Sequence, residues 1–241
     1  MTFEIYLDLF SPTCRPVFIF AKKNNIPSEF KKISLFEGGQ YAEEFGKINM
    51  MRKLPAIRDG DFTLAESVAI LLYMAEKFRT PDHWYPRDLQ TRAQVNEYLS
   101  WHHTQLRMHT SKVFWFKLLI PKTLGKEVPK EKMDSALEDL EGSLKMLEEK
   151  FLQDKPFIAG EHISLADLVG IVEIMQPVGA GVDVFAKRPK LVAWRDRVQA
   201  AVGKELFDEA HQDILSVVEV VESLDSSKLQ GFKPHIMKLL L

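Results

Sequence analysis

The first residues change from a strand pattern to a helix pattern, and this change limits the possible folds more than any other feature. Residues 3–9 alternate between apolar side chains and Glu4, Tyr6 and Asp8, which is the period-two pattern of a strand. Ser11-Pro12 interrupts the pattern, and residues 14–23 then indicate a helix. The chain therefore opens with a strand-turn-helix unit.

Further short patterns continue this unit. Asp59-Gly60 is a strong hairpin signal, and apolar residues at near-helical spacing close the unit as a helix. In chain order, the patterns predict a strand at 29–35, a short helix at 41–48, strands at 55–58 and 62–64 and a helix at 66–78. The expected order is βαβαββα, an α/β domain that we assign to residues 1–80.

Two prolines mark the end of this domain. Pro81 and Pro86 flank Asp82-His83-Trp84-Tyr85, a composition that suits an ordered linker more than a flexible one. We assign the linker to residues 81–87 and a second domain to residues 88–241.

The second domain carries helical patterns throughout. Its clearest helix spans 133–151, where apolar residues advance by steps of three and four and form one stripe. Ser164 and Asp167 are spaced as a capping box, in which both side chains satisfy free N–H groups at a helix start. The other expectations are a long or kinked helix at 89–120, an end or kink at Pro177, a helix that starts at Pro189 and stops near Gly203, and a further helix at 206–221. The domain is predicted to be all-α.

Charge and composition exclude several classes of protein. The chain has 32 Lys plus Arg and 34 Asp plus Glu, a net charge of -2, which gives no general reason to bind nucleic acid or anionic membranes. No apolar run reaches the roughly 18 residues of a membrane span. Cys14 is the single cysteine, so there is no internal disulfide and no zinc-type Cys/His pattern. We expect no metal and a cytoplasmic location.

Ser11 is the first candidate for chemistry. It lies where a strand ends and a helix begins, a place that favours an anion. Its hydroxyl could donate to a thiolate held there and lower the thiol pKa. The alternative is that Ser11 only caps the helix. Cys14 completes an S-x-x-C spacing that resembles the thioredoxin C-x-x-C motif without its first thiol, and we expect Cys14 to be core.

Two later segments could bind a peptide-like ligand. If Pro55 follows a cis bond, the backbone of Leu54 turns outward and can pair with an extended peptide; the alternative is an ordinary trans proline at a strand start. Glu66-Ser67 precedes an apolar helix stripe, where Ser67 and free N–H groups could hold a carboxylate and Glu66 an ammonium. The alternative is a helix cap with a favourable first-turn acid.

These residues together resemble a glutathione transferase, which has a thioredoxin-like N-terminal domain and an all-helical C-terminal domain. The resemblance runs nearly end to end and is nearest to the theta class. Besides Ser11, Cys14-Arg15 and Glu66-Ser67, it rests on Tyr6-Leu7-Asp8-Leu9, Phe20-Ala21-Lys22-Lys23-Asn24, Asp59-Gly60-Asp61-Phe62-Thr63-Leu64, Trp84-Tyr85-Pro86, Ile163-Ser164-Leu165-Ala166-Asp167-Leu168 and Pro177-Val178-Gly179-Ala180-Gly181.

The resemblance implies roles for particular residues in binding glutathione. Ser11 would stabilise the thiolate, Leu54 before a cis-Pro55 would pair with the cysteinyl backbone, and Glu66 and Ser67 would bind the γ-glutamyl end. The glycyl carboxylate would meet Lys53 and Gln40. Since the theta pattern usually has histidine in place of Gln40, a charged contact becomes a neutral one and glutathione affinity is expected to be lower.

The second-substrate pocket is implied less directly. Arg107 resembles a theta-class residue that faces the active site, with a solvated helix charge as the alternative. Trp115 is a candidate wall of the pocket, with core packing as the alternative. Residues 229–241 would form a lid over the pocket, which brings His235 near it. The adjacent His102 and His103 diverge around a helix and are not expected to share a metal.

The implied function is an enzyme that conjugates glutathione to small hydrophobic electrophiles such as alkyl halides and epoxides, with reduction of organic hydroperoxides as a further activity. Glutathione is a co-substrate, and no other cofactor is expected. A non-catalytic ligand-binding or scaffolding protein of the same fold is the alternative. A dithiol oxidoreductase is disfavoured by Ser11. The resemblance also implies a homodimer in the cytoplasm or nucleus, with a role in detoxification.

Overall fold

A mixed four-stranded sheet and its covering helices form the first part of the chain in the computed structural model, which describes residues 2–240. The elements are β1 (Phe3–Leu7), α1 (Cys14–Lys23), β2 (Ser28–Lys32), α2 (Glu43–Ile48), β3 (Ala56–Asp59), β4 (Phe62–Ala65) and α3 (Ser67–Lys77). The predicted order βαβαββα is confirmed. Met1 and Leu241, which end the two predicted domain ranges, lie outside the described residues.

The sheet has the strand order β2-β1-β3-β4. β1 runs parallel to β2 and antiparallel to β3, and β3 and β4 form an antiparallel hairpin. Gly60 turns this hairpin with φ +64°, a conformation that glycine adopts at no steric cost, so the Asp-Gly signal is confirmed. Ile5 and Ile57 stand opposite each other and are fully buried at the centre of the sheet.

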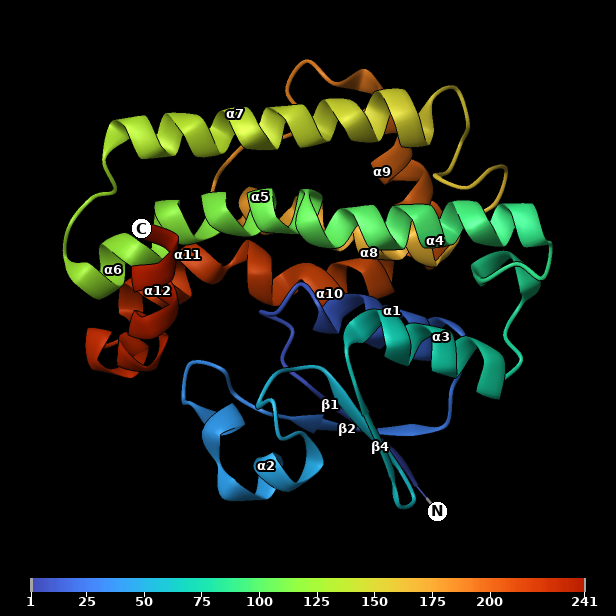
Figure 1. The fold of residues 1–241 in the computed structure, drawn as a ribbon, viewed down its shortest axis with the longest axis horizontal. Helices are drawn as coiled ribbons and strands as arrows, with labels where there is room; N and C mark the ends of the chain where they lie inside the picture. Colours follow the sequence, from blue (N-terminus) through green and yellow to red (C-terminus); the bar gives the residue numbers. More distant parts are fainter. Residues whose placement is uncertain (1, 241) are drawn as a thin grey trace.

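Helices α1 and α3 lie between the sheet and the second part of the chain, and α2 lies at the far end (Figure 1). Every residue of α1 from Cys14 to Ala21 is buried, because the helix packs on the sheet on one side and on helices of the second part on the other. Burial raises the pKa of the Cys14 thiol to about 12. Cys14 is a core residue, as expected.

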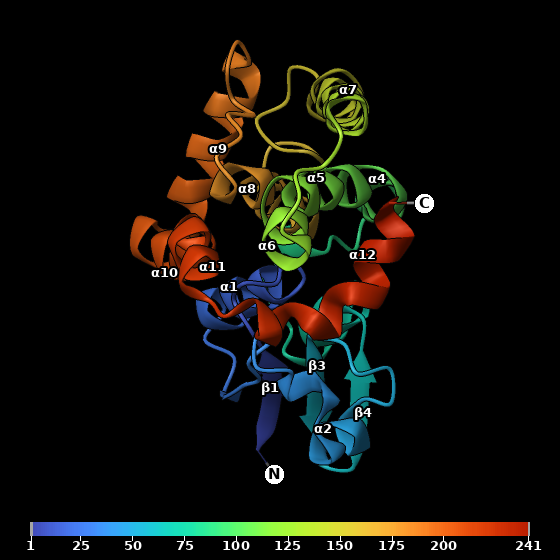
Figure 2. The same cartoon turned by 90° about the vertical axis from the view of Figure 1, so that its left-hand side faces the viewer.

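The second part is helical, as predicted (Figures 1 and 2). Its α-helices are α4 (Leu89–Thr104), α5 (Leu106–Phe114), α6 (Ile120–Leu124), α7 (Lys130–Met146), α8 (Leu165–Gly179), α9 (Pro189–Val202), α10 (Lys204–Leu215), α11 (Val217–Ser223) and α12 (Lys233–Leu240). The predicted long helix at 89–120 is interrupted at Gln105, whose φ of -120° and ψ of -85° are not helical. A π-helical turn at Trp115–Leu119 follows α5.

Helix α8 runs through the centre of this part, and nearly all of its residues are buried. The capping box at Ser164 and Asp167 is present at its start. Pro177 lies inside α8, which ends at Gly179. Pro189 begins α9 and Gly203 follows its last residue with φ +101°, so both sequence expectations are confirmed.

The segment between α3 and α4 is ordered and packed. It contains a 3-10 turn at Asp82–Trp84, and the buried Trp84 ring lies 5.5 Å from the ring of Phe20 on α1. The proline-flanked segment therefore contributes an anchor to the core of the α/β part, as an ordered linker does.

Two helix glycines differ in the space around them, which gives a stability prediction. A Cβ on Gly179 would lie 2.3 Å from the carbonyl oxygen of Ile214 on α10, so Gly179→Ala must push α8 and α10 apart. We expect it to lower the free energy of unfolding by about 1–3 kcal/mol. An added Cβ on Gly142 of α7 would meet nothing within 4 Å among residues 2–240 outside its chain neighbours and the backbone of its own helix, so Gly142→Ala should raise stability by about 0.5–1 kcal/mol. Urea unfolding of both variants measures this, and equal effects would contradict it.

Candidate active site

The loop after β1 is held from two sides. The Asp8 carboxylate accepts hydrogen bonds from the backbone N–H groups of Phe10 (3.0 Å) and Leu35 (2.8 Å). From the other side, Nη1 of Arg15 donates to the carbonyl oxygens of Leu9 (3.0 Å) and Phe10 (3.3 Å). Ser11 directly follows these bonded residues, so its backbone position is fixed before any ligand binds.

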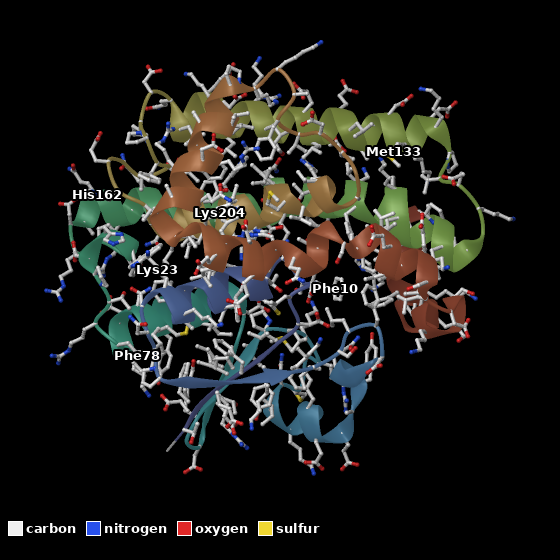
Figure 3. The ribbon with its side chains drawn as sticks, turned by 180° about the vertical axis from the view of Figure 1, so that it is seen from behind. Phe10, Lys23, Phe78, Met133, His162 and Lys204 are labelled. Atoms are coloured by element: carbon white, nitrogen blue, oxygen red, sulfur yellow. The ribbon has the colours of Figure 1, made fainter. Side chains whose placement is uncertain are left out.

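Arg15 also ties this loop to the second part of the chain. Its Nη2 donates to the carbonyl oxygen of Val172 (2.8 Å) and to Oε1 of Gln176 (2.7 Å), both on α8. The side chain is fully buried, and burial lowers its pKa to about 10, so Arg15 stays protonated at neutral pH. Figure 3 shows Phe10, whose carbonyl oxygen accepts from Arg15, at the junction of the two parts.

The Ser11 hydroxyl does not cap helix α1. Its Oγ lies 2.7 Å from Oγ1 of Thr13, and Thr13 in turn donates to the carbonyl oxygen of Leu54 at 2.9 Å. The N–H groups of Cys14 and Arg15 at the helix start are bound to the Ser11 carbonyl oxygen. The capping alternative for the hydroxyl is therefore wrong, and the Ser11 side chain is available at the loop surface.

A polar cavity of about 270 Å³ brings several predicted residues together. Lys53, Leu54, Glu66, Ser67 and Arg107, which come from three separate segments, all line it. The remaining lining residues are Thr13, Asn49, Pro55, Ala65 and His103. The peptide bond between Leu54 and Pro55 is cis, as the resemblance implies.

The start of α3 presents polar groups to this polar cavity. Ser67 is the first residue of α3 and is 2% exposed, and its Oγ has no hydrogen-bond partner among residues 2–240. Glu66 precedes it with φ +71°, an uncommon conformation for a residue with a side chain. Such backbone outliers cluster at ligand-binding sites, and a buried hydroxyl without a partner needs one. This corner is suited to a bound polar group.

Arg107 adds positive charge to the same cavity. Its Nε donates to the fully buried Glu173 at 2.6 Å, and its Nη1 lies 3.2 Å from Nδ1 of His103. Its Nη2 has no partner within the described chain, residues 2–240. Burial, and after it the charge of Arg107, lowers the pKa of His103, which favours its neutral form. Arg107 is thus held in the wall of the cavity, and the alternative of a solvated helix charge is wrong.

An apolar cavity of about 160 Å³ lies beside the polar one. Ser11 lines it together with Phe10, Pro12, Leu35, Phe36, Ser111, Phe114, Trp115, Leu119, Gln176 and Phe232. Trp115 is half-buried and forms part of its wall, as predicted. Since Thr13 lines the polar cavity and Ser11 the apolar one, the two cavities adjoin at a hydroxyl pair 2.7 Å apart.

The C-terminal segment covers the apolar cavity. Figure 2 shows it running across the junction of the two parts before α12. The Phe232 ring lies 5.5 Å from that of Trp115, and the buried Leu229 and Ile236 fix the segment. The His235 ring lies 4.8 Å from that of Trp115 but does not line the cavity, so it reaches the cavity only through Trp115. Of residues 229–240, Phe232 lines the apolar cavity, and the role of this segment as a lid stays a prediction.

Gln40 lies apart from the other predicted binding residues. It lines a third cavity of about 380 Å³, between the segment 35–41 and the C-terminal residues Lys228, Gly231 and Phe232. Gln40 is 4% exposed, and its Oε1 has no partner within the described residues. The structure does not bring Gln40 and Lys53 into one cavity, so their shared role at a carboxylate stays a prediction.

Several lining residues were missed by the sequence analysis, among them Thr13 and His103 of the polar cavity. Thr13 was part of the segment Ser11-Pro12-Thr13-Cys14, but no role was assigned to it. His103 was considered only as a metal ligand. Its position four residues before Arg107 on a helical pattern places both on one face, which is the signal that could have found it.

Across residues 2–240, no group of three His, Cys, Asp or Glu side chains could hold a metal ion. None of the helices described is long and apolar enough for a membrane span.

The two parts of the chain match two known domain families. Residues 10–77 match the glutathione S-transferase N-terminal domain, and residues 104–201 match the glutathione S-transferase C-terminal domain. The sheet domain with the polar cavity and the helical domain behind the apolar one are thus the two domains of a glutathione S-transferase.

Individual relatives narrow this class. The chain is 51% identical to glutathione S-transferase theta-3 of Mus musculus over 240 residues, with 100% of both chains covered. It is similar to the structure of human glutathione-S-transferase T1-1 in its apo form (48% identity, TM-score 0.93, 99% of this chain and 100% of that chain). A human theta-class enzyme in complex with the glutathione conjugate of 1-menaphthyl sulfate is similar as well (44% identity, TM-score 0.92, 99% and 98% covered). The chain belongs to the theta class of the glutathione S-transferases.

Proposed function

We propose that this protein conjugates reduced glutathione to small hydrophobic electrophiles, with Ser11 stabilising the glutathione thiolate. The observation that carries the proposal is the meeting of a polar and an apolar cavity at the Ser11 and Thr13 hydroxyls. A peptide thiol placed from the polar side reaches its acceptor on the apolar side at this point. The apolar cavity of about 160 Å³ favours small electrophiles such as alkyl halides and epoxides.

The residues divide the work as follows. The backbone of Leu54 pairs with the cysteinyl residue, Glu66 binds the γ-glutamyl ammonium, and Ser67 binds its carboxylate. Lys53 attracts the glycyl carboxylate, with Gln40 as a neutral contact. Arg107 adds a positive field at the polar cavity. Both substrates are then oriented before reaction, which removes much of the entropic cost of the encounter.

The reaction needs only the thiolate and a leaving group. Ser11 donates a hydrogen bond to the sulfur and so lowers the thiol pKa. The sulfur attacks the electrophilic carbon, and a C–S bond forms as the carbon–halogen bond or an epoxide C–O bond breaks. The halide leaves, whereas the alkoxide of an opened epoxide stays on the conjugate and takes up a proton from water. With an organic hydroperoxide, the sulfur attacks oxygen and an alcohol leaves, after which a second glutathione thiol yields glutathione disulfide and water.

A glutathione-dependent turnover assay tests the proposal. The panel contains alkyl halides, epoxides and cumene hydroperoxide, and calorimetry measures glutathione binding in parallel. Turnover of at least one substrate together with binding is expected. A protein that is inactive on the whole panel and binds no glutathione would instead fit the scaffolding alternative.

Glu66 supplies a prediction for substrate affinity. Glu66→Gln should raise the KM for glutathione by about tenfold to a hundredfold, because it removes a charged partner of the ammonium group. The kcat at saturating glutathione should change little, since the ammonium is remote from the reacting sulfur. Steady-state kinetics separate the two effects. Glu161→Gln, at an exposed position outside the cavities, is the matched control, and an unchanged KM in Glu66→Gln would contradict the assignment.

A homodimer and a cytoplasmic role in detoxification, with nuclear location allowed, complete the proposal. Its support is a set of exposed apolar side chains drawn from both parts of the chain, including Met50, Phe62, Leu89 and Met108. Such side chains are more favourable when a partner covers them. Sedimentation velocity measures the oligomeric state, and a monomer at micromolar concentration would contradict a stable dimer.

A further inference from the structure

Thr13 has two hydrogen-bond partners and only one proton. Its Oγ1 lies 2.9 Å from the carbonyl oxygen of Leu54, which can only accept, and 2.7 Å from Oγ of Ser11. The Thr13 proton is therefore directed to Leu54. The proton between the two hydroxyls must then come from Ser11, so the Ser11 O–H points to Thr13 in this hydrogen-bond arrangement.

This direction conflicts with the role proposed for Ser11. A hydroxyl stabilises a thiolate only when it donates to the sulfur, and here the one proton of Ser11 is used on Thr13. The hydroxyl of Thr13 has no separate task in the helix, because no side-chain hydrogen bond caps the start of α1. Its two contacts instead connect Ser11 to Leu54, 41 positions away in sequence.

We propose that Thr13 is a positioning residue that turns the Ser11 proton toward the sulfur when glutathione docks on Leu54. The inference rests on the proposed function. When the cysteinyl N–H donates to the Leu54 carbonyl oxygen, that oxygen no longer depends on Thr13. The Thr13 hydroxyl then rotates and donates a hydrogen bond to Oγ of Ser11. The Ser11 hydroxyl is thereby free to donate its hydrogen bond to the thiolate. No bond between heavy atoms changes, and both protons stay on their own oxygens.

Two physical effects favour this reversal. A thiolate is a charged acceptor and forms a stronger hydrogen bond than the neutral carbonyl that Thr13 leaves. A hydroxyl that accepts a hydrogen bond also becomes a better donor, so Thr13 strengthens the bond from Ser11 to sulfur. The polar environment of the thiol is thereby completed only after the peptide backbone of glutathione is in place.

Thr13→Val tests the inference because valine keeps the shape of threonine and lacks its hydroxyl, and Thr13→Ser is the matched control. The thiol pKa of bound glutathione is measured by ultraviolet titration of the thiolate, and the pH profile of kcat/KM is measured with an alkyl halide. In Thr13→Val we expect the thiol pKa and the apparent pKa of the kcat/KM profile to rise by about one unit. At pH values below the pKa, this lowers the thiolate fraction about tenfold. Thr13→Ser, which keeps a hydroxyl, should have kcat/KM values within about threefold of the wild type across the pH profile.

A double-mutant cycle of Ser11 and Thr13 distinguishes an effect through Ser11 from a general structural effect of Thr13. In the Ser11→Ala background, adding Thr13→Val should not shift the thiol pKa further, because Thr13 acts through Ser11. An unchanged pH profile in Thr13→Val, or the same shift in both backgrounds, would overturn the inference while the wild-type activity still supports the proposed function. A wild-type protein that binds no glutathione would contradict both the proposed function and the inference about Thr13. Thr13→Ala replaces Thr13→Val if valine prevents folding.

Discussion

Ser11→Ala is expected to lower kcat/KM for glutathione conjugation by about 10²–10³-fold. The Ser11 hydroxyl lies where the two cavities adjoin, and the proposed function places the negatively charged sulfur there. Removing one preorganised donor from such a place typically costs a factor of this size. The thiol pKa of bound glutathione should rise toward the value of a free thiol, about 8.5. Activity of the variant should therefore recover partly as the pH is raised.

The controls for this experiment are in the chain itself. Ser100 is exposed on α4, and within residues 2–240 its hydroxyl bonds only to the carbonyl oxygen of Asn96 on its own helix, so Ser100→Ala should keep full activity. Thermal unfolding of Ser11→Ala should match the wild type closely, because the loop is held by Asp8 and Arg15 through backbone groups. Wild-type turnover by a well-folded Ser11→Ala protein would remove Ser11 from the mechanism.

Asp167→Ala is expected to lower the free energy of unfolding by about 3–5 kcal/mol. The Asp167 carboxylate is fully buried and accepts hydrogen bonds from the N–H groups of Ile158 (2.9 Å) and Ser164 (2.9 Å). It also accepts from Oγ of Ser164 (3.0 Å) and from the Trp194 indole (2.9 Å). Alanine leaves these buried donors without an acceptor, at about 1–3 kcal/mol each, partly relieved by water.

Urea unfolding monitored by circular dichroism measures this loss. Asp154→Ala is the control, since the Asp154 side chain is 98% exposed and pairs only with Lys190 at the surface. Surface ion pairs contribute little, so its effect should stay within about 0.5 kcal/mol. A small effect in Asp167→Ala would mean that solvent reaches the start of α8 and replaces the carboxylate.

Local patterns predicted most of the elements. Alternation over residues 3–9, the Asp59-Gly60 turn and the capping box at Ser164 each depend on neighbours within a few positions, and each is confirmed. The strand at 3–9 is shorter than expected, because β1 ends at Leu7 and the next residue, Asp8, binds the backbone of the loop. Local patterns also singled out Ser11, Leu54-Pro55 and Glu66-Ser67. The resemblance added the other candidate site residues, which local patterns alone could not have chosen: Gln40, Lys53, Arg107, Trp115 and His235.

Long-range contacts could not be predicted in the same way. Gln40 and Lys53 were expected to bind one carboxylate, but they line separate cavities, so their shared role stays a prediction that the sequence could not place in space. No proline or glycine lies near Gln105, so the sequence carries no signal for the helix break there. The bond from Thr13 to Leu54 joins two loops whose distance depends on the packing of α1 and β3. Such features depend on tertiary contacts, and the short-range hydrophobic periodicity of a single sequence does not reveal them.

Arg15 has a consequence for how the protein loses its structure. Its guanidinium binds carbonyl oxygens of the Ser11 loop and of α8 at the same time, and it is fully buried. Separating the two domains would leave both sets of carbonyls and a buried charge without partners, so partial opening along this boundary is costly. The two domains should therefore melt together in one cooperative transition, with catalysis and helical content disappearing at the same temperature. An isolated N-terminal domain would lack the α8 contacts that support its own Ser11 loop.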